Sequence, residues 1–391
     1  MTFPGAPKLV EGLDWGIFFL KKVYDIIFFM NTKTVTLGGK GITKQIKIGG
    51  GAPVSVQTMW KEGITDLSSN NEKLERILRE LNELSLMGCD IVRFAVPDVE
   101  SADGLCLIAE RCSMPLVADI HFDHKLALAC LKGNVAAIRI NPGNIGSVEN
   151  TRAVVEACRD NGVAIRIGIN SGSLPQDLQQ KIMNGEISRS QGLCETAVRE
   201  ASVFEDLNFD QYVVSMKSSD VKETIECNRF YAQKFNNPLH LGVTEAGPLV
   251  GGLIKSSIAF STLLNEGIGD TIRVSLSSSA QNEVLAGVNI LKECGKRKKG
   301  VTLVSCPRCG RIGFDVHSFV DRWQNRLLAM DKDITVAVMG CVVNGPGEGR
   351  HADLGIAGTG EKAIIFKKGK IVRTIDAKDA DKVFEEEINS L

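Results

Sequence analysis

The 391-residue sequence has almost no excess of either charge: 46 lysines and arginines stand against 47 aspartates and glutamates. Such a balance offers no global surface for nucleic acid or anionic lipid, although it can conceal a local basic pocket. Aromatic residues are scarce at 6 %, and no uninterrupted apolar run reaches the roughly 20 residues that span a membrane. The composition is that of an ordinary globular protein, and we expect a cytoplasmic location without nucleic-acid or membrane partners.

A disulfide framework is also missing. The 11 cysteines are an odd number and no signal peptide precedes them, so we expect free thiols in a reducing compartment. Six of them stand alone in helix-like stretches, where a cysteine usually acts as a small buried hydrophobe. These six are Cys106, Cys112, Cys130, Cys158, Cys194 and Cys227.

Aromatic residues gather only where the chain begins. Seven of the 22 lie before residue 31, around the apolar stretch 14–30. Lys21, Lys22 and Asp25 interrupt this stretch, which also lacks the basic start and cleavage site of a signal peptide. Residues 1–32 are an atypical extension, either an interfacial helix or, as we favour for residues 1–29, an upstream misreading with Met30 as the true start.

From residue 53 onward one pattern repeats eight times. A short β-branched run ends in a polar residue and a helical pattern follows, as in right-handed βαβ units. Eight units predict a closed (β/α)8 TIM barrel rather than an open sheet, and the hairpin-like segment 34–50 could plug its base. The eight runs are 53–59, 90–97, 115–123, 136–143, 163–172, 212–220, 239–247 and 271–279.

The carboxyl ends of barrel strands carry the chemistry, and polar residues concentrate there in this sequence. Five cations lie at these strand ends, and the two carboxylates there, Asp119 and Glu245, cannot neutralise them. We therefore expect an anionic, phosphorylated ligand. His121 and His240 also lie at strand ends, although a lone barrel histidine is more often a core residue. The cations are Arg93, Arg139, Arg166, Lys217 and Arg273, and the amides are Asn141 and Asn170.

After the barrel domain, placed at 33–294, a basic linker is predicted at 295–300. The charges of segment 292–300 need no function beyond solvation. Residues 301–391 predict a smaller α/β domain with its own core. Its strand-like runs are 302–306, 334–340, 353–358, 362–367 and 370–374, and its helices are 318–330 and 377–389.

The smaller domain carries a C-x-x-C motif at Cys306 and Cys309, and Cys341 follows without a second such motif. Three interpretations stay open. One is a zinc site completed by His317 or His351. The others are a dithiol redox pair that leaves Cys341 unused, and an iron–sulfur cluster with three thiolates and one iron free for an oxygen ligand.

Segment 345–348, Gly-Pro-Gly-Glu, follows Cys341 closely. Glycine takes positive φ easily and Pro346 stiffens the bend between two glycines, so we expect a turn. Such a turn could fold the Glu348 carboxylate back toward a metal bound by Cys341. The alternative is a plain surface turn with an exposed glutamate.

The chain closely resembles the 4-hydroxy-3-methylbut-2-enyl diphosphate synthase family, reductive enzymes near the end of the methylerythritol phosphate route to isoprenoids. The matching segments extend from about residue 33 to 360 and include APVSVQTM, DIVRFAVP, RINPGNIG, EGIGDTIRVSLS, SCPRCGR and GCVVNGPGE. Trp60, where the family usually has a small polar residue, and loop 247–257 depart from the pattern. The extension 1–32 lies outside it.

The resemblance implies a TIM barrel followed by a [4Fe-4S] cluster domain, and a homodimer that receives electrons from ferredoxin or flavodoxin. The implied reaction is the reductive ring opening and dehydration of 2-C-methyl-D-erythritol 2,4-cyclodiphosphate to (E)-4-hydroxy-3-methylbut-2-enyl diphosphate. The implied cluster ligands are Cys306, Cys309, Cys341 and Glu348, the last of which substrate would displace.

The resemblance also implies roles around the substrate. Glu245 matches an acidic group that faces it, and Asn344 lies beside the cluster. The strand-end residues Asp119, His121, Asn141, His240 and Arg273 are grouped with the binding residues. The implied diphosphate-binding positions are Arg93, Arg139, Arg166 and Lys217, with Asn170, Ser215 and Ser218 nearby.

Two other classes of protein explain the sequence less well. A pterin- or corrinoid-linked methyltransferase would leave the five cations unexplained. A binding protein stabilised by a structural zinc ion would leave the polar residues at the barrel rim unexplained.

Overall fold

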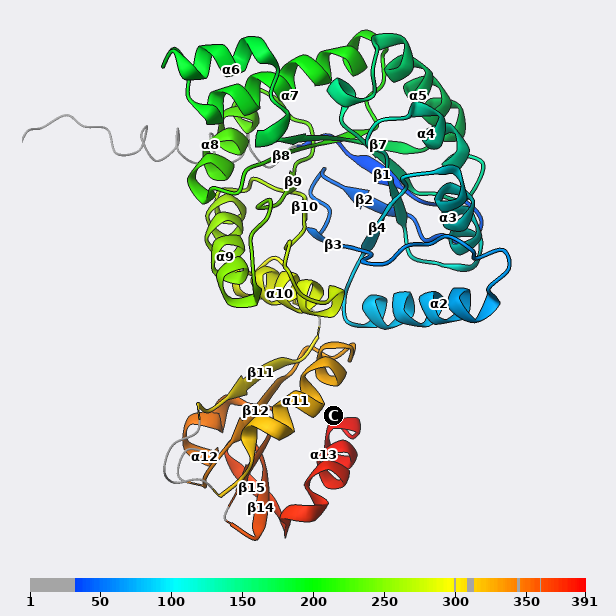
Figure 1. Cartoon of the computed structure of the whole chain (residues 1–391). Coiled ribbons are helices and arrows are strands. Elements are labelled where there is room, and N and C mark those ends of the chain that lie inside the picture. The colour runs from blue at the N-terminus through cyan, green and yellow to red at the C-terminus, as the bar shows by residue number, and fades with distance from the viewer. Residues whose placement is uncertain (1–31, 299, 308–312, 343–344, 359) are drawn as a thin grey trace, which may run out of the picture.

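The computed structural model describes residues 32–298, 300–307, 313–342, 345–358 and 360–391. Within these ranges Figure 1 shows a barrel of strands ringed by helices, followed along the chain by a smaller α/β unit. The extension before residue 32, Cys309 and Asn344 lie outside the described residues, as does the side chain of Glu348.

Eight parallel strands form the barrel in the order β8-β7-β6-β5-β4-β3-β10-β9. A parallel bridge between Val214 and Leu239 joins the two ends of this order, so the predicted closed barrel is confirmed. Each of the eight predicted runs contains one strand. The strands are β3 (Ser55–Met59), β4 (Ile91–Ala95), β5 (Leu116–Asp119), β6 (Ala137–Ile140), β7 (Ala164–Asn170), β8 (Tyr212–Lys217), β9 (His240–Leu241) and β10 (Thr271–Ile272).

Helices return the chain between these strands on the outside of the barrel (Figure 1). Several of these helices begin at an N-cap side chain. Asp98, Ser147 and Ser279 each accept a hydrogen bond from a backbone N–H in the first turn of the helix that follows. No described helix is long and apolar enough to cross a membrane. The helices are α2 (Asn71–Leu86), α3 (Val99–Arg111), α4 (His124–Cys130), α5 (Val148–Asn161), α6 (Gln176–Met183), α7 (Arg189–Asp206), α8 (Val221–Ala232), α9 (Leu249–Asn265) and α10 (Ala280–Glu293).

The predicted hairpin is β1 (Val35–Leu37) paired antiparallel with β2 (Ile46–Ile48). Its buried Val35, Leu37 and Ile48 cluster with residues from the amino-terminal ends of the barrel strands, among them Ile91 and Val213. The hairpin therefore plugs the base of the barrel and leaves the carboxyl ends of the strands for the site.

Most of the isolated cysteines take the predicted structural role. Five of the six are buried, and Cys106 is half-buried. Burial raises the pKa of Cys130 and Cys158 to about 12, which keeps both thiols protonated at neutral pH.

The basic linker is not merely solvated. The Arg297 guanidinium lies 3.2 Å from the Asp90 carboxylate. The Lys292 ammonium donates to the Val301 carbonyl at 2.9 Å. Two charges of segment 292–300 thus connect the end of α10 to the barrel and to the first residues of the next unit. The expectation that these charges serve only solvation was wrong.

The smaller unit is built on the sheet β11-β12-β13-β14-β15, in which β11, β12 and β13 are parallel and β14 and β15 antiparallel. Its core lies under two helices, where Phe384 meets Phe319 and Trp323 edge-on at ring distances of 5.1 and 4.8 Å. The elements are β11 (Thr302–Ser305), α11 (Val316–Leu328), β12 (Thr335–Met339), α12 (Gly345–Glu348), β13 (Leu354–Gly358), β14 (Lys362–Lys367), β15 (Lys370–Asp376) and α13 (Ala380–Asn389).

Segment 345–348 is a single helical turn, α12, and not the predicted glycine bend. The Gly345 backbone N–H donates to the Cys341 carbonyl at 3.0 Å, a helical i to i−4 bond. Neither Gly345 nor Gly347 takes a positive φ. Pro346 fits because the first turn of a helix does not need its missing N–H.

Candidate active site at the carboxyl ends of the barrel strands

Charged side chains from neighbouring strands share one layer of the barrel. In the parallel register Asp119 of β5 pairs with Arg139 of β6, and Arg139 pairs with Arg166 of β7. Arg139 Nη1 donates to Asp119 Oδ1 at 3.1 Å. Arg93 Nε of β4 lies 3.3 Å from Asp119 Oδ2. One buried carboxylate thus serves two arginines.

Two glycines make room for these long side chains. A Cβ on Gly168 would lie 2.3 Å from Arg139 Nε, and one on Gly242 would lie 2.6 Å from Lys217 Nζ. The Gly168 carbonyl also accepts a hydrogen bond from Arg139 Nη2 at 3.3 Å. The cations can therefore fold against the barrel wall only where the sequence has no side chain.

The remaining cations have weaker partners. Arg166 donates to the neutral side-chain oxygen of Gln57. Lys217 makes no ion pair with any residue that the structure describes, although it is buried. Arg273 Nε lies 4.0 Å from the Glu283 carboxylate. Three of the five cations thus lack a close counter-ion within the described chain.

Their pKa values reflect this shortage. Burial, with Arg273 and Arg139 nearby, lowers the pKa of Arg93 to about 9 despite its ion pair with Asp119. Burial and the other cations lower the pKa values of Arg166 and Lys217 well below their ordinary values. The site is thus electrostatically unfavourable for the cations alone, and a bound anion would relieve it.

The Asp119 carboxyl responds in the opposite direction. Burial acts to raise its pKa, but Arg93, a hydrogen bond with His121, and Arg139 hold that pKa well below its usual range. His121 Nε2 lies 3.4 Å from Asp119 Oδ2 and its side chain is 52 % exposed. His121 is therefore placed at the rim with the charged layer.

His240 is a buried residue of β9. Its Nδ1 lies 3.4 Å from Thr271 Oγ1, and its Nε2 has no partner among the described residues. Burial and the nearby cations, Lys217 first among them, lower its pKa well below the ordinary value. The ring is therefore neutral, below the layer of arginines.

Not every predicted binding residue offers a free group. Ser218 Oγ donates to Glu223 at 2.6 Å and accepts from the Asp220 backbone N–H at 3.1 Å. Ser215 Oγ donates to the Ile167 carbonyl at 3.3 Å. Asn170 is half-buried and caps the short helix that follows β7.

Two further predicted residues lie in strand-end loops. Asn141 is buried directly after β6 and makes no side-chain capping bond. Glu245 is exposed after β9 and has a φ of 50°. A non-glycine residue in this left-handed region stores about 1–3 kcal/mol of strain, which the fold has to hold in place. Glu245 does not join the buried charged layer.

The second buried carboxylate is Glu283, which the sequence analysis missed. It belongs to α10 and not to a strand end, so the strand-end pattern could not reveal it. The buried face of α10 repeats at Ala280, Glu283, Val284, Gly287 and Val288. A glutamate inside that apolar periodicity was the available signal, as was Gln57 inside the apolar run of β3.

The thiols of the smaller unit also meet at strand ends. Cys306 directly follows β11, and Cys341 follows β12 by two residues. The Gly340 backbone N–H donates to Cys306 Sγ at 3.1 Å, which brings the two strand ends together. Both cysteines are half-buried. Within the described residues no three potential metal ligands converge, and Cys309 and the Glu348 side chain lie outside them.

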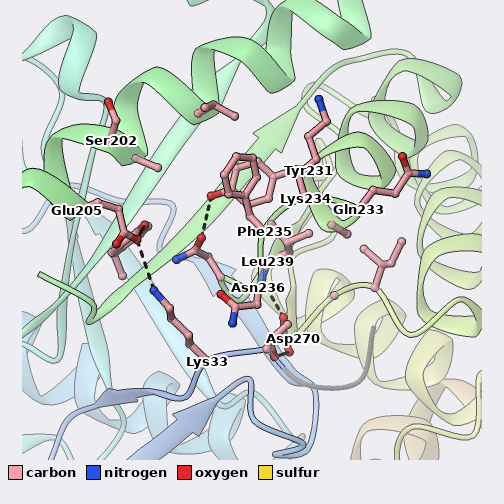
Figure 2. A pocket seen from close by; sticks show the side chains of 18 of the residues that line it. Lys33, Ser202, Glu205, Tyr231, Gln233, Lys234, Phe235, Asn236, Leu239 and Asp270 are labelled. Carbon is pink, nitrogen blue, oxygen red and sulfur yellow. Dashed lines mark hydrogen bonds and ion pairs between the residues drawn. The ribbon is translucent and has the colours of Figure 1, made fainter. Parts of the chain in front are cut away.

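A cavity of about 840 Å³ lies at the other end of the barrel, beside the residues that precede β8, β9 and β10 (Figure 2). Several of its polar groups are paired with one another. Lys33 lies 3.4 Å from Glu205, and Tyr231 donates to Asn237 at 3.0 Å. TIM-barrel chemistry belongs to the carboxyl ends of the strands, so this cavity is not the candidate site despite its size.

The fold and site together define a two-domain TIM-barrel protein with a cation-lined catalytic end. Residues 39–288 match the GcpE TIM-barrel domain, and residues 302–390 match the GcpE protein C-terminal domain. The chain therefore belongs to the GcpE family.

Curated relatives carry one name, 4-hydroxy-3-methylbut-2-en-1-yl diphosphate synthase (flavodoxin). The protein from Treponema denticola is 54 % identical over 387 residues, covering 92 % of this chain and 98 % of the relative. The protein from Treponema pallidum is 53 % identical, covering 92 % of each chain. The protein from Clostridium acetobutylicum is 47 % identical, covering 84 % of this chain and 92 % of the relative.

Proposed function

We propose that this chain converts 2-C-methyl-D-erythritol 2,4-cyclodiphosphate to (E)-4-hydroxy-3-methylbut-2-enyl diphosphate by reductive ring opening and dehydration. The observation that carries the substrate is the charge imbalance at the strand ends, where five buried or nearly buried cations have two buried carboxylates. Buried charges without partners are costly, and a cyclic diphosphate supplies the oxygens that guanidinium groups bind in pairs.

In this proposal Arg93, Arg139, Arg166 and Lys217 bind the diphosphate. Arg273, Asn141 and Asn170 line the same end of the barrel, with Asp119 and His121 orienting the arginines. Ser215, Ser218 and His240 support the site from within the fold, because their polar groups are engaged or buried. Glu245, whose carboxyl is exposed, donates a proton to the hydroxyl group that leaves as water, and Asn344 completes the polar lining.

The residues of the smaller unit fit an iron–sulfur cluster. Cys306 and Cys341 are half-buried thiols at adjacent strand ends, and an N–H···S bond of the kind made by Gly340 tunes such clusters. Cys306, Cys309, Cys341 and Glu348 would hold a [4Fe-4S] cluster, which would pass on two low-potential electrons from the donor, one at a time, and would offer a Lewis-acidic iron. The protein's own task is to bind and orient the diphosphate, exclude water and deliver protons.

Flavodoxin is the proposed electron donor, because the name of the curated relatives includes it. Ferredoxin is the alternative, and turnover with each purified donor would decide between them. We also propose a homodimer and the domain limits 33–294 for the barrel, 295–300 for the linker and 301–391 for the cluster domain. Mass spectrometry of the natural N-terminus tests Met30 as the start, which a peptide from residues 1–29 would exclude.

The test is an anaerobic assay on protein with a reconstituted cluster. We expect about four irons and four sulfides per chain, and formation of the allylic diphosphate when the cyclodiphosphate and a reductant are added. One zinc and no colour would support the zinc site, with His317 or His351 as a ligand. A cluster without turnover would overturn the substrate assignment or the electron donor.

A further inference from the structure

The first and last barrel strands along the chain, β3 and β10, are neighbours, and their contact, the β3–β10 seam, is short. Its ladder has two residue pairs, Thr271 with Ser55 and Ile272 with Val56. The rim cation Arg273 comes one residue after that ladder ends. The backbone of the barrel therefore does little to hold the two sides of the seam together at the level of the site.

A buried carboxylate holds them instead. Glu283 has a fully buried side chain and accepts from Thr58 Oγ1 at 2.7 Å and from Lys61 Nζ at 2.6 Å on the β3 side. On the β10 side it accepts from the Leu276 backbone N–H at 3.0 Å and lies 4.0 Å from Arg273 Nε. One side chain of α10 thus joins both loops of the seam.

Lys61 is a sixth cation at the same end of the barrel. Its backbone is placed by Trp60, whose backbone N–H donates to the Arg93 carbonyl at 2.9 Å and whose ring stacks on Phe94 at a centroid distance of 5.5 Å. The Lys61 side chain is 37 % exposed, in contrast to the nearly buried arginines. An ammonium has three donors, and the contact with Glu283 uses one of them. The other two can reach a ligand.

We propose that Lys61 is a further binding residue for the anionic substrate, and that Glu283 is a positioning residue that holds Lys61 and Arg273 at the seam. This inference rests on the proposed function, because the anion is the cyclic diphosphate. Glu283 carries one negative charge against two cations, so the group keeps a net positive charge. The positions of Lys61 and Arg273 thus depend on Glu283, a buried residue of α10.

The experiment uses holoenzyme with reconstituted cluster and four variants: Lys61→Gln, Lys61→Arg, Glu283→Gln and the control Lys222→Gln. Lys222 is 84 % exposed on α8, so its loss removes one charge away from the site. KM and kcat for the cyclodiphosphate are measured with the thermal unfolding midpoint. We expect Lys61→Gln and Glu283→Gln to raise KM roughly 10-fold, the effect of one charge-assisted hydrogen bond, with little change in kcat. Lys61→Arg should recover most of the loss, and Lys222→Gln should match the wild type.

A wild-type KM in Lys61→Gln would overturn the binding role. A lower unfolding midpoint with unchanged KM in Glu283→Gln would show that Glu283 only fastens the seam, and would overturn the positioning role. If the wild type does not turn over the cyclodiphosphate, the proposed function fails separately. Calorimetric binding of inorganic pyrophosphate then tests the cation site alone, and equal affinity in wild type and Lys61→Gln would overturn it.

Discussion

The barrel site and the thiol site both use the carboxyl ends of parallel strands, yet they hold their groups differently. Arg139 and Arg166 are members of β6 and β7, so the strand ladder fixes their backbones. Cys306 and Cys341 come after β11 and β12 have ended. The barrel organises its charges before any ligand arrives, whereas the positions of the thiols depend more on loops and on the group that they bind.

The first prediction separates the two regions by removing one thiol. Cys341→Ser replaces a soft thiolate with a hydroxyl, a poor iron ligand, so we expect loss of most of the iron and of turnover. Affinity of the barrel for inorganic pyrophosphate should stay unchanged, because the cation layer does not use Cys341. Iron and sulfide content, turnover and calorimetry measure the three effects.

Cys294→Ser is the matched control, since Cys294 is also half-buried but lies at the end of α10. It should keep iron and activity. Full iron content and turnover in Cys341→Ser would contradict the assignment of Cys341 as a ligand.

The second prediction tests whether the cations serve the ligand or the fold. Arg166→Gln should weaken cyclodiphosphate binding by roughly 2–5 kcal/mol, the cost of losing a buried charge pair. It should also raise the unfolding midpoint, because Arg166 is buried with only neutral Gln57 as a described partner. Calorimetric affinity and thermal unfolding are compared in the same preparation.

Arg139→Gln gives the contrast. It should weaken binding similarly but lower stability, because Asp119 then loses one of its two arginines. Arg152→Gln, on the exposed side of α5, should change neither quantity. If Arg166→Gln kept normal affinity and lost stability, the cations would be a structural network.

The difference between residues on strands and residues in loops also explains which features could be predicted from the sequence. Strand periodicity located all eight barrel strands and the cations at their ends, because a charged residue in an apolar run stands out. It also located the five strands of the smaller unit and its helices α11 and α13. It missed Glu283, whose partners Thr58 and Lys61 lie 225 and 222 residues earlier in the chain and meet it only when β3 packs beside β10.

Predictions made from local residue types were less reliable outside the strands. Glycines beside Pro346 predicted a bend, yet the bond from Gly345 to the Cys341 carbonyl makes a helical turn. Gly345 is closely packed at this point, because a Cβ on it would lie 2.7 Å from that of Ala357. Similarly, the basic linker looked solvated because its partner Asp90 lies two hundred residues earlier in the chain.

The third prediction concerns a substitution that shifts one of the buried cations at the strand ends without removing a charge. Gly242→Ala places a methyl group 2.6 Å from Lys217 Nζ. Because Lys217 is buried, its end can move only toward the ligand space, so we expect KM for the cyclodiphosphate to rise about 3–10-fold, or roughly 0.7–1.4 kcal/mol. The cluster content should not change. Gly251→Ala, where nothing lies within 4 Å of the new methyl, is the control and should leave KM unchanged.

The fourth prediction has the smallest functional effect and compares two carboxyls of the barrel. Asp119 lies among cations and stays ionised, whereas Glu200 of α7 is half-buried with no described cation beside it, and burial raises its pKa to about 7. An unfolded glutamate titrates near 4.5, so between these values the unfolded state binds fewer protons than the folded state. The free energy of unfolding therefore falls as pH rises from about 4.5 to 7.

Glu200→Gln cannot ionise, so it should be more stable than the wild type by about 1–3 kcal/mol at pH 8, and the gain should vanish near pH 4.5. Chemical denaturation at both pH values measures the difference. Glu156→Gln, an exposed change on α5, should show no such pH dependence. A gain of equal size at both pH values would mean that the amide simply packs better and that burial does not raise the pKa of Glu200.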